Sequence, residues 1–255
     1  MRFMTDEEYE RYWDELGGIR EAIASDLSSY EPDVVLDVAC GWGYYTIRLA
    51  DRLPSGMTVA VDVVPSAFTN MRRIQPARDA LKSIEPVMAD ASRLPLRDSV
   101  FDLVTSFLGM RDICMTTGED GVRATIEEMI RATRPSHAIA LAVTPPDMAE
   151  TEELLIAIRV EGEVFGARSL PSDFYGNIFR REGVELISSK IYQTGVKMTT
   201  CQARTEIMDG IPIAREIYGR EVPDFEEIWE RYGPTIERHG YAMYSKVTVL
   251  LGRKF

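Results

Sequence analysis

The sequence predicts an α/β protein in which short strands alternate with helices in one open, mostly parallel sheet. Residues 34–50, VVLDVACGWGYYTIRLA, join an apolar run typical of a strand buried on both faces to a glycine-rich turn and an amphipathic helix. Further apolar runs at 58–62 and 100–106 have the length of buried strands. Sheets of this kind bind ligands beyond the carboxyl ends of their strands, so we expect the functional site there.

The turn after the first strand has the composition of a ligand cradle. Asp37 lies at the end of the strand, and Gly41 and Gly43 permit a tight turn and a close backbone approach that a side chain at either position would obstruct. From Tyr44 the pattern is helical. The third glycine of the dinucleotide fingerprint G-x-G-x-x-G is absent and Thr46 stands in its place, which disfavours a pyrophosphate cofactor.

The next three predicted strands also end on polar side chains. The strand Thr58–Asp62 ends on an acid 19 residues after Gly43, a position that suits ribose hydroxyls. A third strand is expected to end at Asp90, and a fourth, Val100–Ser106, follows after one turn.

The remaining elements follow from apolar spacing and turn signals. A helix from Thr5 to about Ser28 begins with a capping box from Thr5 to Glu8, and its aromatic residues Tyr12 and Trp13 are candidate pocket linings. The other expected elements are a helix Gly121–Thr133, a strand Ala138–Thr144, helices Met148–Phe165 and Pro171–Arg181, a strand Val184–Tyr192, two helices within Cys201–His239, and a last strand Ala242–Leu251.

Four strand ends carrying Asp37, Asp62, Asp90 and Ser106 in this order resemble the class I S-adenosylmethionine-dependent methyltransferases, over about Val34 to Thr144. The resemblance implies a Rossmann-like, doubly wound, seven-stranded sheet with an antiparallel last strand and helical additions on the substrate side. It also implies S-adenosyl-L-methionine as cofactor and S-adenosyl-L-homocysteine as product. The chain is then one methyltransferase domain with a helical cap (1–30), a cofactor-binding core (31–146), and substrate-side helices with the last strands (147–255).

The resemblance assigns parts of the cofactor to individual residues. Ala39 to Gly43 line the methionine part, Asp62 holds both ribose hydroxyls, and Asp90, with the Ala91 backbone beside it, faces the adenine amine. Ser106 and Phe107 border the sulfonium. The expected cofactor-binding set is Asp37, Ala39, Cys40, Gly41, Gly43, Asp62, Val63, Asp90, Ala91, Ser106 and Phe107.

Some of these residues also have local alternatives that the sequence leaves open. Asp37 is equally suited to accept the amides of its own turn, and Asp90 to begin an Asx-turn. Cys40 has the character of a small packing residue.

The segment after the fourth strand resembles the ubiquinone and menaquinone biosynthesis C-methyltransferases. Their fourth strand leads into Gly-hydrophobic-Arg-Asn, which is Gly109-Met110-Arg111-Asp112 here, with aspartate in place of asparagine. With a phenolic acceptor, Asp112 would accept the hydroxyl proton and Arg111 would steady the phenolate, so these two are the candidate catalytic residues. The alternative is a local salt bridge or a helix cap.

The expected function is therefore methyl transfer to a carbon or oxygen of a small apolar or aromatic acceptor. Two alternatives remain open. A cofactor-binding protein without turnover would fit the change from asparagine to aspartate at Asp112. A nicotinamide-dependent oxidoreductase would share the turn and the ribose acid but would need the missing glycine.

Composition narrows the classes of partner. A net charge of -12 over 255 residues and a pI near 4.8 argue against broad binding to nucleic acid, which needs a cationic surface. Three scattered cysteines match neither a disulfide framework nor a zinc motif, so no metal is expected. The first residues have no signal-type apolar core and no apolar run spans a membrane, so we expect a cytoplasmic protein. The sequence leaves the oligomeric state open.

Overall fold

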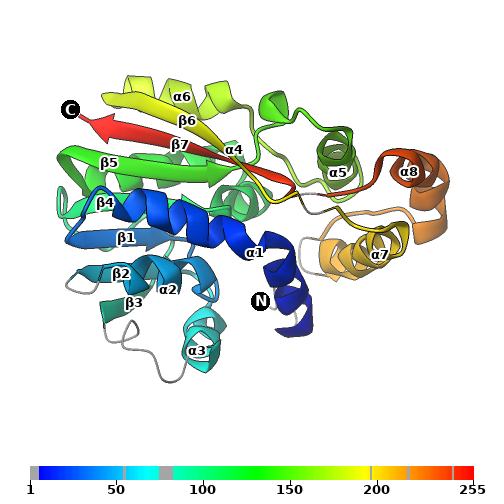
Figure 1. Ribbon diagram of the computed structural model, residues 1–255, viewed down its shortest axis with the longest axis horizontal. Helices are drawn as coiled ribbons and strands as arrows, with labels where there is room; N and C mark the ends of the chain where they lie inside the picture. Colours follow the sequence, from blue (N-terminus) through cyan, green and yellow to red (C-terminus); the bar gives the residue numbers. More distant parts are fainter. Residues whose placement is uncertain (1–5, 54–55, 75–82, 196, 217–218, 243) are drawn as a thin grey trace.

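A computed structural model describes residues 6–53, 56–74, 83–195, 197–216, 219–242 and 244–255 (Figure 1). Its strands are β1 Val34–Val38, β2 Met57–Asp62, β3 Ile84–Met88, β4 Phe101–Phe107, β5 Thr133–Val143, β6 Val184–Gln193 and β7 Lys246–Lys254. They form a seven-stranded sheet in the order β3-β2-β1-β4-β5-β7-β6, and β7 is antiparallel to both of its neighbours. The predicted doubly wound sheet with an antiparallel last strand is confirmed.

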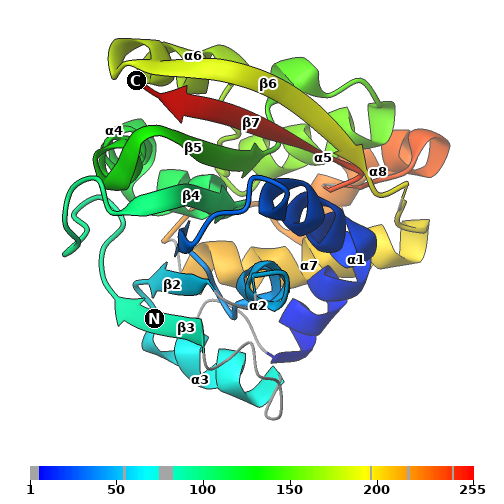
Figure 2. The ribbon, with the colours of Figure 1, turned by 60° about the vertical axis from the view of Figure 1, so that its left-hand side comes forward.

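Helices cover both faces of this sheet and its carboxyl edge. The α-helices are α1 Asp6–Ser28, α2 Tyr44–Asp51, α3 Pro65–Ile74, α4 Gly109–Ala132, α5 Glu152–Glu163, α6 Ser172–Arg181, α7 Thr200–Glu216 and α8 Phe225–His239. A short 3-10 turn, η2, spans Pro146–Met148. Helices α1 and α2 lie on one face and α4 and α6 on the other, while α5, α7 and α8 gather beyond the carboxyl ends of the parallel strands (Figures 1 and 2).

Alternation along the buried strands builds a separate core on each face. In β1, Val35 packs in the cluster that α1 and α2 cover, whereas Leu36 and Val38 pack in the cluster that α4 and α6 cover. A third cluster, which includes Ile207 and Ile228, joins α5, α7 and α8 to each other. The late helices therefore form their own packed layer over the strand ends.

Several element boundaries differ from the sequence prediction. The helix after β4 begins at Gly109 instead of Gly121, because its two halves are joined through a non-helical Gly118 (φ 73°, ψ -169°) that interrupts the apolar periodicity. Strand β5 begins at Thr133 instead of Ala138, since Thr133 pairs with Phe101 before a register shift. A proline and exposed polar residues at the start of β5 hide this pairing in the sequence.

Two other strands and one helix also differ from their predicted bounds. Strand β3 ends at Met88, two residues before Asp90. The last strand runs from Lys246 to Lys254 because Tyr241 makes an isolated bridge with Met198 instead of joining β7. The start of α5 at Glu152 likewise falls four residues later than predicted, after the η2 turn.

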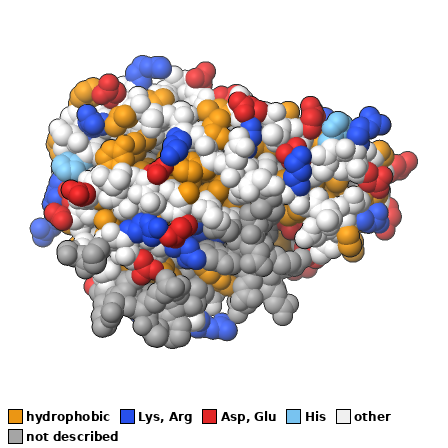
Figure 3. Space-filling model, viewed as in Figure 1, with side chains coloured by type: hydrophobic (Ala, Val, Ile, Leu, Met, Phe, Trp, Pro, Cys, Tyr) orange, Lys and Arg blue, Asp and Glu red, His pale blue; other side chains and the backbone are white. Residues whose placement is uncertain are grey.

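The predicted capping box falls on Thr5, outside the described residues, as do the side chains of Glu8, Tyr12 and Trp13. Within the part of the chain that the structure describes, no helix is long and apolar enough to cross a membrane. Figure 3 shows Lys and Arg side chains interspersed with Asp and Glu on the described part of one face.

Candidate active site

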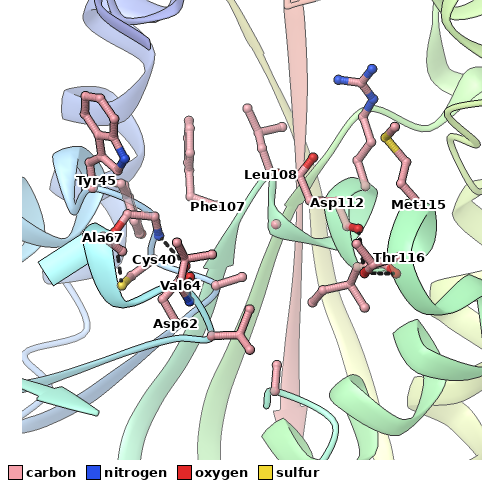
Figure 4. A pocket seen from close by; sticks show the side chains of 18 of the residues that line it. Cys40, Tyr45, Asp62, Val64, Ala67, Phe107, Leu108, Asp112, Met115 and Thr116 are labelled. Carbon is pink, nitrogen blue, oxygen red and sulfur yellow. Dashed lines mark hydrogen bonds between the residues drawn. The ribbon is translucent and has the colours of Figure 1, made fainter. Parts of the chain in front are cut away.

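A cavity of about 760 Å³ lies beyond the carboxyl ends of β1, β2 and β4, a size typical of small-ligand sites. Figure 4 shows Asp62 on one wall and Asp112 and Met115 on the opposite wall. Eleven of the thirteen predicted site residues line this cavity, namely Asp37, Ala39, Cys40, Gly41, Asp62, Val63, Asp90, Ala91, Phe107, Arg111 and Asp112. Gly43 and Ser106 are not among the lining residues.

The loop after β1 turns sharply and packs back on β2. Ala39, Gly41 and Gly43 have positive φ values of 56°, 54° and 79°, a region that favours glycine. The Cys40 N–H donates to the Val61 carbonyl at 3.0 Å, which ties the turn to β2. A non-glycine residue at positive φ, such as Ala39, stores backbone strain, a feature that clusters at ligand sites.

Gly43 has a second role besides the tight turn that the sequence predicts. A Cβ placed there would approach the Met71 side chain to 2.3 Å, so the glycine lets α2 pack against α3 instead of leaving room for a ligand. At Gly109 a Cβ would lie 2.5 Å from the Ala39 Cβ and 3.0 Å from the Ser106 Oγ. The start of α4 therefore packs closely against the turn at residues 39–43, called the cofactor turn below, and Ser106 is fully buried beneath α4.

Asp62 ties the ends of β1 and β2 together. Its Oδ2 accepts the Gly41 N–H at 2.8 Å, and its Oδ1 accepts the Val64 N–H at 2.9 Å. Burial raises the pKa of Asp62, and these backbone N–H groups oppose the rise. Each carboxylate oxygen has a second lone pair, so the group can still accept hydrogen bonds from the two hydroxyls of a diol.

Asp90 adopts the local turn that the sequence leaves open. Its Oδ1 accepts both the backbone N–H of Ser92 at 2.8 Å and the Ser92 hydroxyl at 2.7 Å. This Asx-turn presents Asp90 at the edge of the cavity, next to Ala91. The turn and a ligand contact are therefore compatible at this position.

Asp37 is bound by a side chain and not by the amides of its turn. Its Oδ2 accepts the Thr46 hydroxyl at 2.6 Å, and its Oδ1 is buried without a partner among the described residues. Burial raises the pKa of Asp37 to about 7, the Thr46 hydrogen bond opposes this rise, and Asp62 adds to it. Such a carboxyl group beside a cavity is suited to receive a cationic or hydrogen-bonding ligand.

Arg20 is a site residue that the sequence reasoning missed. Its side chain is only 5% exposed and lines the cavity from α1, with the guanidinium carbon 5.3 Å from the Phe107 ring centroid and 5.7 Å from that of Tyr44. One signal was available: an arginine stands within the buried apolar stripe of α1, between Ile19 and Ile23.

The opposite wall is built by the first half of α4 together with α5 and α7. Arg111 donates to Glu161 of α5 and, at 3.1 Å, to the Tyr244 hydroxyl. The local Arg111–Asp112 salt bridge that the sequence left open is therefore not the pairing found. Arg111 instead fastens the start of α4 to α5 and to the segment before β7.

Asp112 faces the cavity from the first turn of α4. It is accessible from the cavity, and its carboxylate has no hydrogen-bond partner among the described residues. The surrounding protein raises its pKa through burial, which Arg111 opposes. Asp62 and Glu161 raise the pKa of Asp112 further through their charge.

The remaining lining of this wall is mixed. The apolar residues Phe107, Met115 and Phe165 line the cavity, whereas Met110 is buried in the core below it. Glu206 and Asp209 of α7 add acidic side chains. The described residues include no cluster of His, Cys, Asp and Glu that could hold a metal ion.

Comparison with known proteins agrees with this geometry. A family model described as a methyltransferase domain matches residues 35–136, which contain the cofactor turn, Asp62, Asp90 and the start of α4. Residues 35–136 form a methyltransferase domain. S-adenosylmethionine, the cofactor that the sequence predicts, is a cation, and the acids along the cavity carry the charge that suits it.

Two curated relatives are similar to part of this chain. It is 34% identical over 129 residues to a demethylmenaquinone methyltransferase from Deinococcus radiodurans, which covers 51% of this chain and 50% of that protein. It is 44% identical over 79 residues to a malonyl-[acyl-carrier protein] O-methyltransferase from Geobacter sulfurreducens, covering 30% of this chain and 27% of that protein. The chain thus spans at most about half the length of these two relatives.

A solved structure extends the likeness to the whole fold. A SAM-dependent methyltransferase from Methanosarcina mazei has a TM-score of 0.61 and 12% identity, covering 90% of this chain and 97% of that chain. The likeness in fold therefore includes the late helices and last strands of this chain as well as residues 35–136.

Proposed function

We propose that this protein transfers a methyl group from S-adenosyl-L-methionine to a small, mainly apolar or aromatic acceptor. The observation that carries the proposal is the order of groups around one cavity. Asp90, Asp62 and the turn at Gly41 follow one another at the ends of β3, β2 and β1, and Asp112 faces them from α4.

The lining fits the cofactor better than it fits a dinucleotide. S-adenosylmethionine carries a diol, an ammonium and a sulfonium but no phosphate, so acidic side chains beside it cause no repulsion. In a dinucleotide site the third glycine of the fingerprint lets the helix pack closely on the strand. Here that position holds Thr46, bonded to the carboxyl of Asp37. This arrangement disfavours the nicotinamide-dependent alternative.

The protein's contribution to transfer is alignment, exclusion of water and control of one proton. The bound cofactor supplies a methyl group activated by a sulfonium. Phe107 and Leu108 lie between the two walls of the cavity, which favours a dry, aligned approach of the acceptor (Figure 4). Asp112 accepts the acceptor's hydroxyl proton, and its raised pKa makes it a stronger base than an exposed aspartate.

Arg111 acts in this proposal as a positioning residue. Its hydrogen bonds to Glu161 and Tyr244 hold together the wall of the cavity on which Asp112 lies. Contact with a phenolate would therefore require the guanidinium to divide its N–H groups between these partners and the phenolate. The names of the two relatives suggest a quinone-type ring and a malonyl group as kinds of acceptor. The aromatic and methionine lining favours the ring for this protein.

A labelled-methyl screen tests the proposal. The protein is incubated with S-adenosylmethionine carrying a radiolabelled methyl group and with sets of phenols, quinols, amines and thiols. We expect transfer to phenols or quinols and displacement of the cofactor by S-adenosylhomocysteine. Absence of S-adenosylhomocysteine binding together with tight NADH binding would overturn the proposal.

The second candidate function is cofactor binding without turnover, which Asp112 favours because related C-methyltransferases have asparagine there. The variant Asp112→Asn separates the two. If Asp112 is the base, the variant loses turnover with every acceptor. If the wild type is inactive and Asp112→Asn transfers methyl groups, the wild type is the cofactor-binding form.

A further inference from the structure

Phe165 lines the cavity just beyond the end of α5 and is only 5% exposed. Its N–H donates to the Glu161 carbonyl at 3.2 Å, which continues the helical turn past the last residue of α5. Phe165 therefore lies one turn after Glu161, whose carboxylate pairs with Arg111. This places the ring on the same side of the cavity as Asp112.

Gly210 of α7 gives the Phe165 ring its position. A Cβ added at Gly210 would lie 2.9 Å from the Phe165 Cζ, 3.2 Å from its Cε1 and 3.4 Å from its Cε2. These atoms form the far end of the ring, so the ring points at the backbone of α7. Gly210 itself also lines the cavity. The ring therefore spans the distance between the end of α5 and the middle of α7.

Packed side chains fill the space behind the ring. Phe165 belongs to the apolar cluster that joins α5, α7 and α8, together with Val160, Ile207 and Ile211. These three side chains are buried and are not among the residues that line the cavity. The cavity therefore stops at the Phe165 ring on this side.

We propose, on the basis of the proposed function, that Phe165, seated against Gly210, ends the acceptor part of the cavity and sets the length of an apolar substituent on the acceptor. The acceptor is then a hydroxylated ring whose hydroxyl meets Asp112 and whose apolar substituent points toward Phe165. Leu16, Met115 and Ile213 add further apolar lining, and an apolar substituent gains affinity as these side chains remove it from water.

The close contact at Gly210 determines how the cavity responds to a substitution there. In Gly210→Ala the new Cβ would come too close to the tip of the ring, so the ring must turn. The apolar cluster behind the ring is packed, whereas the cavity is open space, so the ring turns toward the cavity. The acceptor part of the cavity becomes shorter as a result.

A series of 4-alkylphenols, from methyl to octyl, measures this length. Each phenol is titrated calorimetrically into the protein saturated with S-adenosylhomocysteine, and each is assayed for labelled-methyl transfer. Every methylene that fits should raise the affinity about fourfold, and the gain should stop at one chain length, the break. We expect the break to move to longer chains by about two methylenes or more in Phe165→Ala, and to shorter chains in Gly210→Ala.

Two further variants serve as controls. Gly162 lies inside α5, and the atom nearest to a Cβ added there is the Ala167 carbonyl oxygen at 3.6 Å, so Gly162→Ala should leave the break unchanged. Phe165→Leu shortens the side chain and relieves the contact with position 210. In the Phe165→Leu protein, adding Gly210→Ala should therefore no longer shift the break. Thermal unfolding identifies variants that fail to fold, and if Gly210→Ala is one of them, the longer break expected in Phe165→Leu alone carries the test.

The outcomes separate the length limit from the proposed function. An unchanged break in both Phe165→Ala and Phe165→Leu, or a wild-type series without a break, overturns the role of Phe165 while methyl transfer to phenols still stands. A shift by Gly210→Ala that is equal with and without Phe165→Leu overturns the contact as its cause. If the wild type binds S-adenosylhomocysteine but neither binds nor methylates any phenol or quinol, the proposed function itself fails.

Discussion

The Thr46 hydroxyl donates a hydrogen bond to the Asp37 Oδ2 at 2.6 Å, joining the first turns of α2 to β1 in the buried interior. Thr46 occupies the position where a dinucleotide site has its third glycine. The residue that departs from the dinucleotide fingerprint is therefore the one that orients the Asp37 carboxyl beside the cavity.

Replacing Thr46 with valine should weaken both the fold and the ligand site. The variant keeps the side-chain shape but leaves a buried carboxyl oxygen unpartnered, at an expected cost of about 1–3 kcal/mol in the free energy of unfolding. Urea unfolding measures this cost, and calorimetry measures the accompanying loss of S-adenosylhomocysteine affinity.

Thr58 provides the control for this variant. Its hydroxyl is also buried but has no partner among the described residues, so Thr58→Val should be neutral or slightly stabilising. Equal effects of the two substitutions would mean that the Thr46 hydrogen bond contributes nothing to the fold.

Cofactor affinity should rise with pH through the titration of Asp37. Its pKa of about 7 in the folded protein is raised by burial, so the group is largely protonated at pH 6 and ionised at pH 8. The ionised form attracts the ligand's ammonium, and S-adenosylhomocysteine should bind more tightly at pH 8 than at pH 6. In Asp37→Asn this dependence should flatten, and a variant with the wild-type profile would assign the titration to another group.

The same shift has the opposite sign for stability without ligand. A carboxyl whose pKa is higher in the folded than in the unfolded chain binds its proton more tightly when folded. Asp37 therefore contributes stability at low pH that is lost as the pH rises from about 4 to about 7. Urea unfolding of wild type and Asp37→Asn across this range measures the contribution, and a parallel dependence in both proteins would contradict it.

Asp112→Asn should reduce turnover without reducing cofactor affinity. Removing a general base costs about 10²- to 10⁴-fold in rate, whereas the cofactor contacts lie on the other wall of the cavity. The measurement is the labelled-methyl rate at saturating cofactor beside an S-adenosylhomocysteine titration. Unchanged turnover, or a matching fall in affinity, would remove Asp112 from the role of base.

Gly109→Ala should push the start of α4 away from the cofactor turn. The added Cβ would lie 2.5 Å from the Ala39 Cβ, so the backbone must shift, at an expected cost of about 1–3 kcal/mol. Chemical unfolding and S-adenosylhomocysteine titration should both register the change.

Gly176 offers the matched control for Gly109. It lies inside α6, and no atom would come within 4 Å of a Cβ added there, so Gly176→Ala should stabilise the protein by about 0.5–1 kcal/mol. If Gly109→Ala behaves like Gly176→Ala, the close contact between α4 and the turn is not a constraint.

The sequence predicted what short segments determine. The strand, turn and helix around Gly41 follow from local periodicity. Asp62 ends the next strand at a fixed spacing from this turn, so the sequence alone predicts the turn and the acid. The antiparallel last strand follows from the resemblance to a known family. Asp90 lines the cavity, and its Asx-turn is one of the two arrangements that the sequence leaves open.

Features that depend on distant contacts were missed. Arg20 belongs to the site only because α1 crosses the strand ends, and a position in an apolar stripe does not reveal its neighbours. The pairing of Arg111 with Glu161 joins residues 50 positions apart, whereas the sequence suggested the adjacent Asp112. The early start of α4 was hidden because Gly118 divides one helix into two short patterns.

A crystal structure with S-adenosylhomocysteine is the most direct test of the proposed cofactor site. We expect the ribose hydroxyls within hydrogen-bond distance of Asp62, the adenine beside Asp90, and the amino-acid end along the turn from Ala39 to Gly43. A nucleoside bound on the Asp112 side of the cavity, or a phosphate-bearing ligand in its place, would contradict the account.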